Sequence, residues 1–198
     1  MTASRSGAAA IASSPQRRGG ARPAEHAILG LLASASGAGH GYDLARHFAP
    51  GQPLAEVIRL EPAMLYHHLK RLTAAGWVTA TLEPQIARPA RQVHAITPAG
   101  RAELRRWLAE PVAHTREIRL DFLVKLYFAR QLDPALARRL IDEQRVLLDR
   151  LATSLTERRG AIATNTDVFV ALVLDLRLAQ TEAAVAWLAR ADENTVLP

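Results

Sequence analysis

The chain has 198 residues, of which 25 are Arg or Lys, 19 are Asp or Glu and none is cysteine. This length provides enough material for a hydrophobic core and for one or two compact units. The lack of cysteine excludes a disulfide framework and a cysteine-based zinc site. A membrane span is not expected either, because the most apolar segment, residues 168–178, is short and contains Asp175 and Arg177.

The excess positive charge lies entirely in the first part of the chain. Residues 1–110 hold 13 Arg or Lys and 7 Asp or Glu, a balance of +6, whereas residues 111–198 hold 12 of each. A basic unit followed by a neutral, apolar unit is typical of a protein that binds a polyanion and carries an oligomerisation element.

The first residues, 1–23, are predicted to form a disordered basic arm. They are rich in Arg, Ser, Ala and Gly and contain no acidic residue. Their apolar run, residues 7–12, is too short for a secretory signal, and Arg17 and Arg18 follow that run instead of preceding it. We therefore expect a soluble, cytoplasmic protein.

Two short helices and a link are predicted between residues 24 and 60. Residues 24–33 have one apolar helical face and predict a buried helix. Residues 34–39 are predicted to be a loop, and residues 54–60 a short irregular or extended link. In the helix between them, four side chains are expected to pack inward: Tyr42, Leu44, Ala45 and Phe48.

The stretch 61–78 predicts a short helix that shows one face outward. Pro62 suits the first helical turn and Gly76 suits the position just past the end. An apolar stripe at helical spacing faces the core: Leu65, Leu69 and Leu72. The opposite side is small, aromatic, hydrogen-bonding and cationic: Ala63, Tyr66, His67, Lys70 and Ala74. Such a face suits a DNA groove, and the alternative interpretation is an ordinary solvated helix.

A β-hairpin is predicted to follow, with strands at 77–82 and 91–96 and a turn at 83–90. Arg88 and Arg91 are expected at its tip, where they can reach phosphates or the minor groove. The alternative is a solvated loop. Three short helices followed by a hairpin describe a winged helix-turn-helix.

The first domain is predicted to close with a helix over residues 98–109, which begins at Thr97 as N-cap and buries Leu104, Trp107 and Leu108. We place the winged helix-turn-helix domain at residues 24–110.

Residues 111–198 are predicted to form a helical dimerisation domain of three helices, at 116–132, 133–159 and 168–190. The second has a leucine seam that is broken at Gln144. The third is apolar almost all round near its start, so we expect a second copy of the chain to cover it. The whole protein is thus predicted to be mainly α-helical.

Enzymatic or metal chemistry is not expected. His67 and His68 are adjacent, so their side chains diverge on a helix, and no HExxH pair, nucleophile elbow, phosphate loop or dinucleotide glycine pattern occurs. We predict no catalytic residue, no metal site and no cofactor. The remaining alternative to DNA binding is a helical association module that binds a protein partner.

Five short motifs occur in one order along the chain: His40-Gly41-Tyr42-Asp43-Leu44, Met64-Leu65-Tyr66 with Leu69-Lys70-Arg71-Leu72, Gly76-Trp77-Val78, Ile96-Thr97-Pro98-Ala99-Gly100-Arg101 and Arg119-Leu120-Asp121-Phe122-Leu123-Val124-Lys125-Leu126. Together they resemble the PadR family of bacterial transcriptional regulators, in the branch with a long helical C-terminal dimerisation domain. The resemblance runs from about Ala24 to Arg190. It implies a homodimeric winged-helix repressor, or in some cases an activator, that binds a palindromic operator in the bacterial nucleoid. It also implies release by a small aromatic or hydrophobic effector.

With this resemblance, two sets of binding residues are predicted. The DNA-binding set is Tyr42, Ala63, Met64, Tyr66, His67, Lys70, Arg71, Arg88 and Arg91. The effector-binding set is Trp107, Tyr127, Phe128, Phe169 and Trp187. The chain departs from the family at four positions. The family usually has Ser, Thr or Gly where this chain has Glu61, Ala63 and Met64, and commonly Pro where it has His67. An acid at Glu61 would repel phosphate unless it caps the helix.

Overall fold

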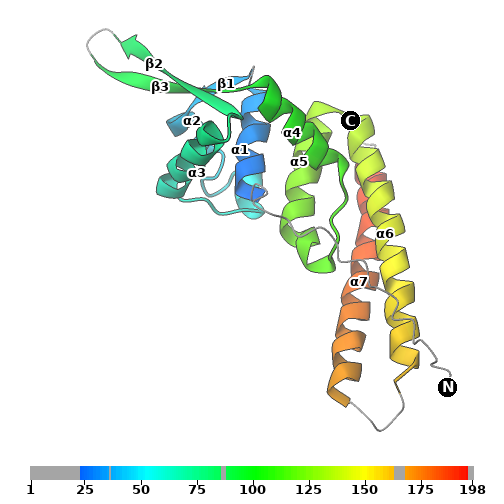
Figure 1. Ribbon diagram of the computed structural model, residues 1–198. Coiled ribbons are helices and arrows are strands. Elements are labelled where there is room, and N and C mark those ends of the chain that lie inside the picture. Colours follow the sequence, from blue (N-terminus) through cyan, green and yellow to red (C-terminus); the bar gives the residue numbers. More distant parts are fainter. Residues whose placement is uncertain (1–22, 36, 86–87, 163–167, 196–198) are drawn as a thin grey trace, which may run out of the picture.

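The computed structural model describes residues 23–35, 37–85, 88–162 and 168–195. A compact unit of short helices and a small sheet is followed by a long antiparallel helix pair that extends away from it (Figure 1). Residues 1–22 of the predicted arm (1–23) and the wing tip at 86–87 lie outside the described residues, whereas Pro23 is the first residue of a helix. Within the described ranges, no helix is both long and apolar enough to cross a membrane.

The first unit is a winged helix-turn-helix, as predicted. Its sheet is antiparallel in the order β1-β3-β2, and the β2–β3 hairpin, the wing, projects away from the helical body (Figure 1). The elements are α1 (Pro23–Ser34), β1 (Ala38–His40), α2 (Gly41–Arg46), a 3₁₀ turn η1 (Pro53–Glu56), α3 (Pro62–Ala74), β2 (Val78–Gln85), β3 (Arg88–Ile96) and α4 (Pro98–Ala109).

The second unit contains the 3₁₀ turn η2 (Thr115–Glu117), the π turn η3 (Ile118–Phe122) and the helices α5 (Leu123–Leu132), α6 (Pro134–Gly160) and α7 (Val168–Thr195). The prediction of one continuous helix over 116–132 was therefore wrong in its first part. Phe122 in the π turn is fully buried and packs edge to face on Trp187 of α7, with ring centroids 6.2 Å apart. This tertiary contact, which local periodicity does not reveal, accompanies the departure from α geometry.

Several predicted helix starts and stops are confirmed, although α7 runs to Thr195, beyond the predicted end at residue 190. The Thr97 hydroxyl accepts a hydrogen bond from the backbone N–H of Gly100 at 3.0 Å, and the Asp133 carboxylate accepts one from Ala135 at 2.9 Å. Gly76 follows α3 with a φ of 72°, a conformation that favours glycine. Glu61 occupies the N-cap position of α3, but its side chain makes no capping hydrogen bond.

Three local predictions in the first unit were wrong. The turn predicted over residues 83–90 is shorter, because β2 continues to Gln85 and β3 begins at Arg88. Tyr42 was expected to pack inward, but its side chain is 72% exposed, because the short α2 turns Leu44, Ala45 and, just past its end, Phe48 toward the core. The expected loop at 34–39 contains the start of β1, which pairs with β3 through Ala38 and Ala95. Pairing with a strand far along the chain is not visible in a Ser, Ala and Gly segment.

Helix α1 lies at the centre of the first unit, between α3 on one side and α4 and α5 on the other (Figure 1). Every residue from Ala24 to Leu32 is buried, so neighbours cover all sides of the helix, not just the predicted face. At Gly30 the helix approaches α5 so closely that an added Cβ would lie 2.5 Å from the ring of Phe128. Two consecutive polar residues of this helix, Glu25 and His26, are therefore buried in the interior.

Trp107 of α4 is the central side chain where α1, α4 and α5 meet. The His26 ring stacks on its indole with centroids 4.2 Å apart, and Lys125 Nζ lies 4.3 Å from the indole centroid. Lys125 also donates hydrogen bonds to the backbone carbonyls of Trp107 and Glu110, at the end of α4. The buried ammonium thus adds donors at the C-terminal end of α4, where backbone carbonyls outnumber the N–H groups of the helix.

His26 also donates from Nε2 to the Glu103 carboxylate at 3.1 Å. Burial lowers the pKa of His26 to about 4, against the opposing effect of Glu103. Burial alone would raise the pKa of Glu103, but the hydrogen bonds and charges of Arg106 and His26 bring it below its ordinary value. At neutral pH the site therefore holds a neutral imidazole beside an ionised carboxylate.

Gln144 of α6 fastens the link between the two units. Its side-chain amide accepts from the backbone N–H of Val112 at 2.7 Å and donates to the carbonyl of Val112 at 3.0 Å. Both partners are buried, so the polar residue that interrupts the leucine seam satisfies a backbone that would otherwise lack partners.

We expect the protein to lose stability on mild acidification because of His26. The unfolded chain binds a proton near pH 6.5 and the folded chain only near pH 4, so stability is full above pH 6.5 and falls as the pH drops. The loss amounts to about 2 kcal/mol at pH 5. His26→Phe keeps a stacking ring and removes the titration. The free energy of unfolding is measured with urea at pH 7.5 and pH 5. Its decrease between the two pH values should be smaller in the variant by this amount. An equal decrease in both proteins would show that His26 does not cause the loss.

Candidate nucleic-acid interface

The outer face of α3 is exposed as predicted. The apolar residues Leu65, Leu69 and Leu72 are buried in the core, which fixes the helix on the unit. The opposite face is open to solvent along its whole length: Ala63, Met64, Tyr66, His67, Lys70 and Ala74. Lys70 has no ion pair with any residue that the structure describes, so its charge is available to an external anion.

The inner side of α3 is tied to α1 by a buried carboxylate. Glu25 Oε1 accepts a hydrogen bond from His68 Nδ1 at 3.0 Å and lies 3.0 Å from Arg71 Nη1. Glu25 and His68 are almost fully buried, whereas the Arg71 side chain is 41% exposed. Among the predicted DNA-binding residues whose side chains the structure describes, Arg71 is therefore the one that already has an internal anionic partner.

A hollow of about 710 Å³ lies between α3 and the wing. Its walls include Tyr66, Lys70 and Ala74 from α3 and Ala80 and Gln92 from the strands. A smaller hollow of about 220 Å³ continues beside it toward α2, and Tyr42, Tyr66 and Arg91 are among its lining residues. The structure thus brings five of the predicted contacts to the edges of two adjoining hollows: Tyr42, Tyr66, His67, Lys70 and Arg91. Three others on α3 line neither hollow: Ala63, Met64 and Arg71.

Tyr66 is positioned by a close approach to Gly41, the first residue of α2. A Cβ built on Gly41 would lie 2.6 Å from the Tyr66 ring and 3.0 Å from its hydroxyl oxygen. Glycine at this position therefore leaves room for the Tyr66 ring against the start of α2. The contact also explains how a half-exposed aromatic side chain can keep one orientation.

The wing places one pair of opposite charges across its two strands. Arg91 is exposed and lies opposite Glu83 in the β2–β3 register, and the exposed Leu82 lies opposite Gln92. Arg88 begins β3, but its side chain lies outside the described residues. Arg91 is thus the predicted wing contact whose exposure can be stated.

Two histidines, His40 and His94, are among the lining residues of the smaller hollow. His94 of β3 is buried, and neither of its ring nitrogens has a hydrogen-bond partner among the described residues. Burial lowers the pKa of His94, and the neighbouring His40 lowers it further. His94 is therefore neutral at physiological pH in the free protein and contributes no charge to this face.

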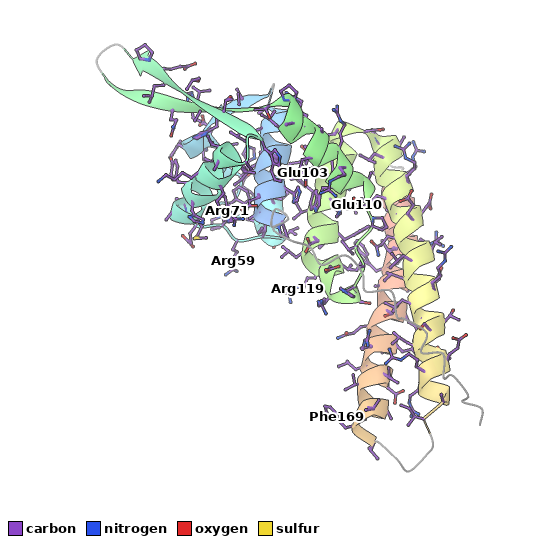
Figure 2. All side chains as sticks on the ribbon, in the orientation of Figure 1. Arg59, Arg71, Glu103, Glu110, Arg119 and Phe169 are labelled. Atoms are coloured by element: carbon purple, nitrogen blue, oxygen red, sulfur yellow. The ribbon has the colours of Figure 1, made fainter. Side chains whose placement is uncertain are left out.

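The five aromatic residues predicted to bind an effector do not converge. Trp107 and Phe128 are fully buried in the core of the first unit, with Tyr127 packed against it. Trp187 belongs to the second core, and Phe169 is 74% exposed near the far end of α7 (Figure 2). A hollow of about 810 Å³ lies elsewhere, with Phe48, Arg59 and Arg119 among its lining residues.

The known families match the two units separately. The family described as "Transcriptional regulator PadR-like family" matches residues 28–106, and the one described as "Virulence activator alpha C-term" matches residues 118–194. Residues 28–106 therefore carry the domain of the PadR-like family. The family resemblance predicted from the sequence is thus confirmed for this domain.

Two relatives illustrate the similarity. "Probable transcriptional regulator Rv1176c" of Mycobacterium tuberculosis is 40% identical over 91 residues, which is 46% of this chain and 46% of that protein. The chain therefore matches about half the length of this relative. "Negative transcriptional regulator PadR" of Bacillus subtilis is 28% identical over 142 residues, or 71% of this chain and 73% of that protein.

Solved structures of Bacillus subtilis PadR are also similar. The complex with operator DNA shares 24% identity and covers 88% of this chain and 99% of that chain, with a TM-score of 0.44. The complex with p-coumaric acid shares 25% identity and covers 94% and 100%, with a TM-score of 0.37.

Glu25, His68 and Gly41 were not among the predicted site residues. A signal for Glu25 did exist, because a charged residue within an otherwise apolar helix must find a partner when that helix is buried. His68 was considered only as a neighbour of His67, and the role of Gly41 depends on a contact between two helices.

We expect Gly41→Ala to weaken DNA binding with little effect on folding. The new methyl group would displace Tyr66, whose outer ring atoms can move toward solvent at small cost. Binding to a duplex, measured by fluorescence anisotropy, should weaken by roughly tenfold while the melting temperature changes by only a few degrees. Gly160→Ala, where the added methyl group meets open space, serves as the control and should leave binding unchanged. Unchanged binding in Gly41→Ala would show that the position of Tyr66 is irrelevant to DNA.

Proposed function

We propose that the protein is a sequence-specific DNA-binding regulator, in which α3 enters the major groove and the wing contacts the neighbouring backbone. The observation that carries the proposal is the arrangement of Tyr66, His67 and Lys70 on an exposed helix face beside a hollow that the wing completes. A helix anchored on one side and polar on the other is how helix-turn-helix proteins present side chains to base edges. Residues 24–110 are then the DNA-binding domain.

We assign residues 111–198 to homodimerisation. The first half of α7 carries a row of exposed apolar side chains that its own α6 does not cover: Val168, Phe169, Val170, Leu172, Val173 and Leu176. A patch of this kind on a regulator is typical of an interface. A second copy of the same helix would bury it in an isologous contact, and the dimer would place two α3 helices on a palindromic operator.

We further propose that the protein represses transcription and that a small aromatic or hydrophobic effector releases it. Repression is supported by the relative named as a negative transcriptional regulator. The five predicted aromatic residues are too widely separated to form one effector site, so that site must be found by screening. Measuring the release of operator DNA by a panel of phenolic compounds tests for an effector. If no compound releases the DNA, control by such an effector is rejected.

We expect selection from random duplexes to return a palindrome with half-sites about one helical turn apart. If each subunit neutralises about four phosphates, log affinity should fall with log salt with a slope of about −7. Anisotropy titrations between 50 and 300 mM salt measure the slope. A slope near zero, or no retained sequence, would favour the alternative of a protein-association module without DNA binding.

We expect Leu176→Glu to dissociate the dimer, because it places a carboxylate on each side of the apolar contact. Sedimentation at micromolar concentration should give a dimer for the natural chain and a monomer for the variant, with operator affinity lower by at least about tenfold. Ser154→Glu adds the same charge at an exposed position on α6 and should remain a dimer. A Leu176→Glu dimer would exclude this face of α7 as the interface.

A further inference from the structure

Two adjacent residues of α1 connect it to opposite sides of the molecule. Glu25 contacts His68 and Arg71 of α3, whereas His26 stacks on Trp107 of α4. Figure 1 shows α1 between these elements, and Figure 2 shows Arg71 and Glu103 on the two sides of it. The orientation of α3 therefore depends on a helix that is itself fixed against the second unit.

The contact of Glu25 with α3 is directional, unlike the apolar packing around it. One oxygen, Oε1, is shared by the imidazole of His68 and the guanidinium of Arg71, each at 3.0 Å. The two donors are three residues apart on α3, so the shared acceptor resists both rotation and sliding of the helix. Leucine contacts at Leu65, Leu69 and Leu72 resist these movements less, because dispersion contacts have no preferred direction.

Burial makes this contact costly to leave incomplete. The Glu25 side chain is only 3% exposed, so its charge is screened little by water and needs both partners. Arg71 is partly exposed and lies on the same helix as the predicted DNA contacts. Its guanidinium is nevertheless directed to an internal carboxylate, whereas Lys70 next to it has no ion pair with any described residue.

We propose that Glu25 is a positioning residue that sets the orientation of α3 through His68 and Arg71, and that Arg71 supports sequence discrimination without neutralising a DNA phosphate. The inference rests on the proposed DNA-binding function. It assigns different roles to neighbouring cations, with Lys70 holding the backbone of any duplex and Arg71 holding the helix that selects the sequence.

The two roles are distinguished by their dependence on salt. A side chain that neutralises a phosphate releases about one counterion, so its removal reduces the slope of log affinity against log salt by about 0.9 and weakens binding to all duplexes. A side chain that only orients the helix leaves the slope unchanged and weakens binding to the selected sequence alone.

The experiment compares Arg71→Gln with the matched variant Lys70→Gln in the full chain. Anisotropy titrations from 50 to 300 mM salt use the duplex obtained by selection and a random-sequence duplex of equal length. For Arg71→Gln we expect roughly tenfold weaker binding to the selected duplex, less than about twofold change on the random duplex, and an unchanged slope. For Lys70→Gln we expect weaker binding to both duplexes and a slope reduced by about 0.9. A reduced slope in Arg71→Gln would overturn the proposal.

Glu25→Gln and the double variant with Arg71→Gln complete the test. If Glu25 acts through Arg71, the double variant should discriminate between the duplexes no worse than the poorer single variant, whereas additive losses would overturn the proposal. Arg71→Lys, which can keep the ion pair, should restore discrimination. Should Glu25→Gln fail to fold, the Arg71 variants still decide the question through the slope. Failure of the natural chain to bind either duplex would instead refute the proposed function.

Discussion

The structure depends on the complete burial of α1. A helix that is covered on every side must place its polar residues against partners inside the protein. Glu25 finds them on α3 and His26 finds them on α4, so one turn of helix joins the face proposed for DNA to the junction with the second unit. Trp107 and Lys125 continue this junction into α5. The polar contacts give the apolar core a defined arrangement that leucine packing alone would leave less specific.

Much of the fold could be predicted because its signals are local. Thr97 and Asp133 begin helices, Gly76 ends one, and the stripe from Leu65 to Leu72 orients α3. These features follow from backbone geometry and helical periodicity, which a single sequence contains. The exposure of the outer face of α3 follows directly from the same stripe, so the candidate DNA-binding face could be placed from the sequence alone.

The remaining features depend on contacts between distant segments. Strand β1 exists because it pairs with β3, the π turn accompanies the contact of Phe122 with Trp187, and Tyr66 lies where Gly41 leaves room for it. The interior partner of Arg71 is also distant, since 46 positions separate it from Glu25 in the sequence. Propensity and charge counts treat Arg71 as one more surface cation, and only the fold shows that it faces a buried carboxylate.

The two hydrogen bonds between Gln144 and Val112 have a geometric consequence. Because both hydrogen-bonding groups of the Val112 backbone are held by α6, the link between the two units has little freedom to swing. In the proposed dimer, the rigid link would then fix the separation of the two α3 helices. The distance between operator half-sites would be encoded in helices that never touch the double helix, and changes in α6 or α7 could evolve a new operator spacing while the base-contacting side chains stay the same.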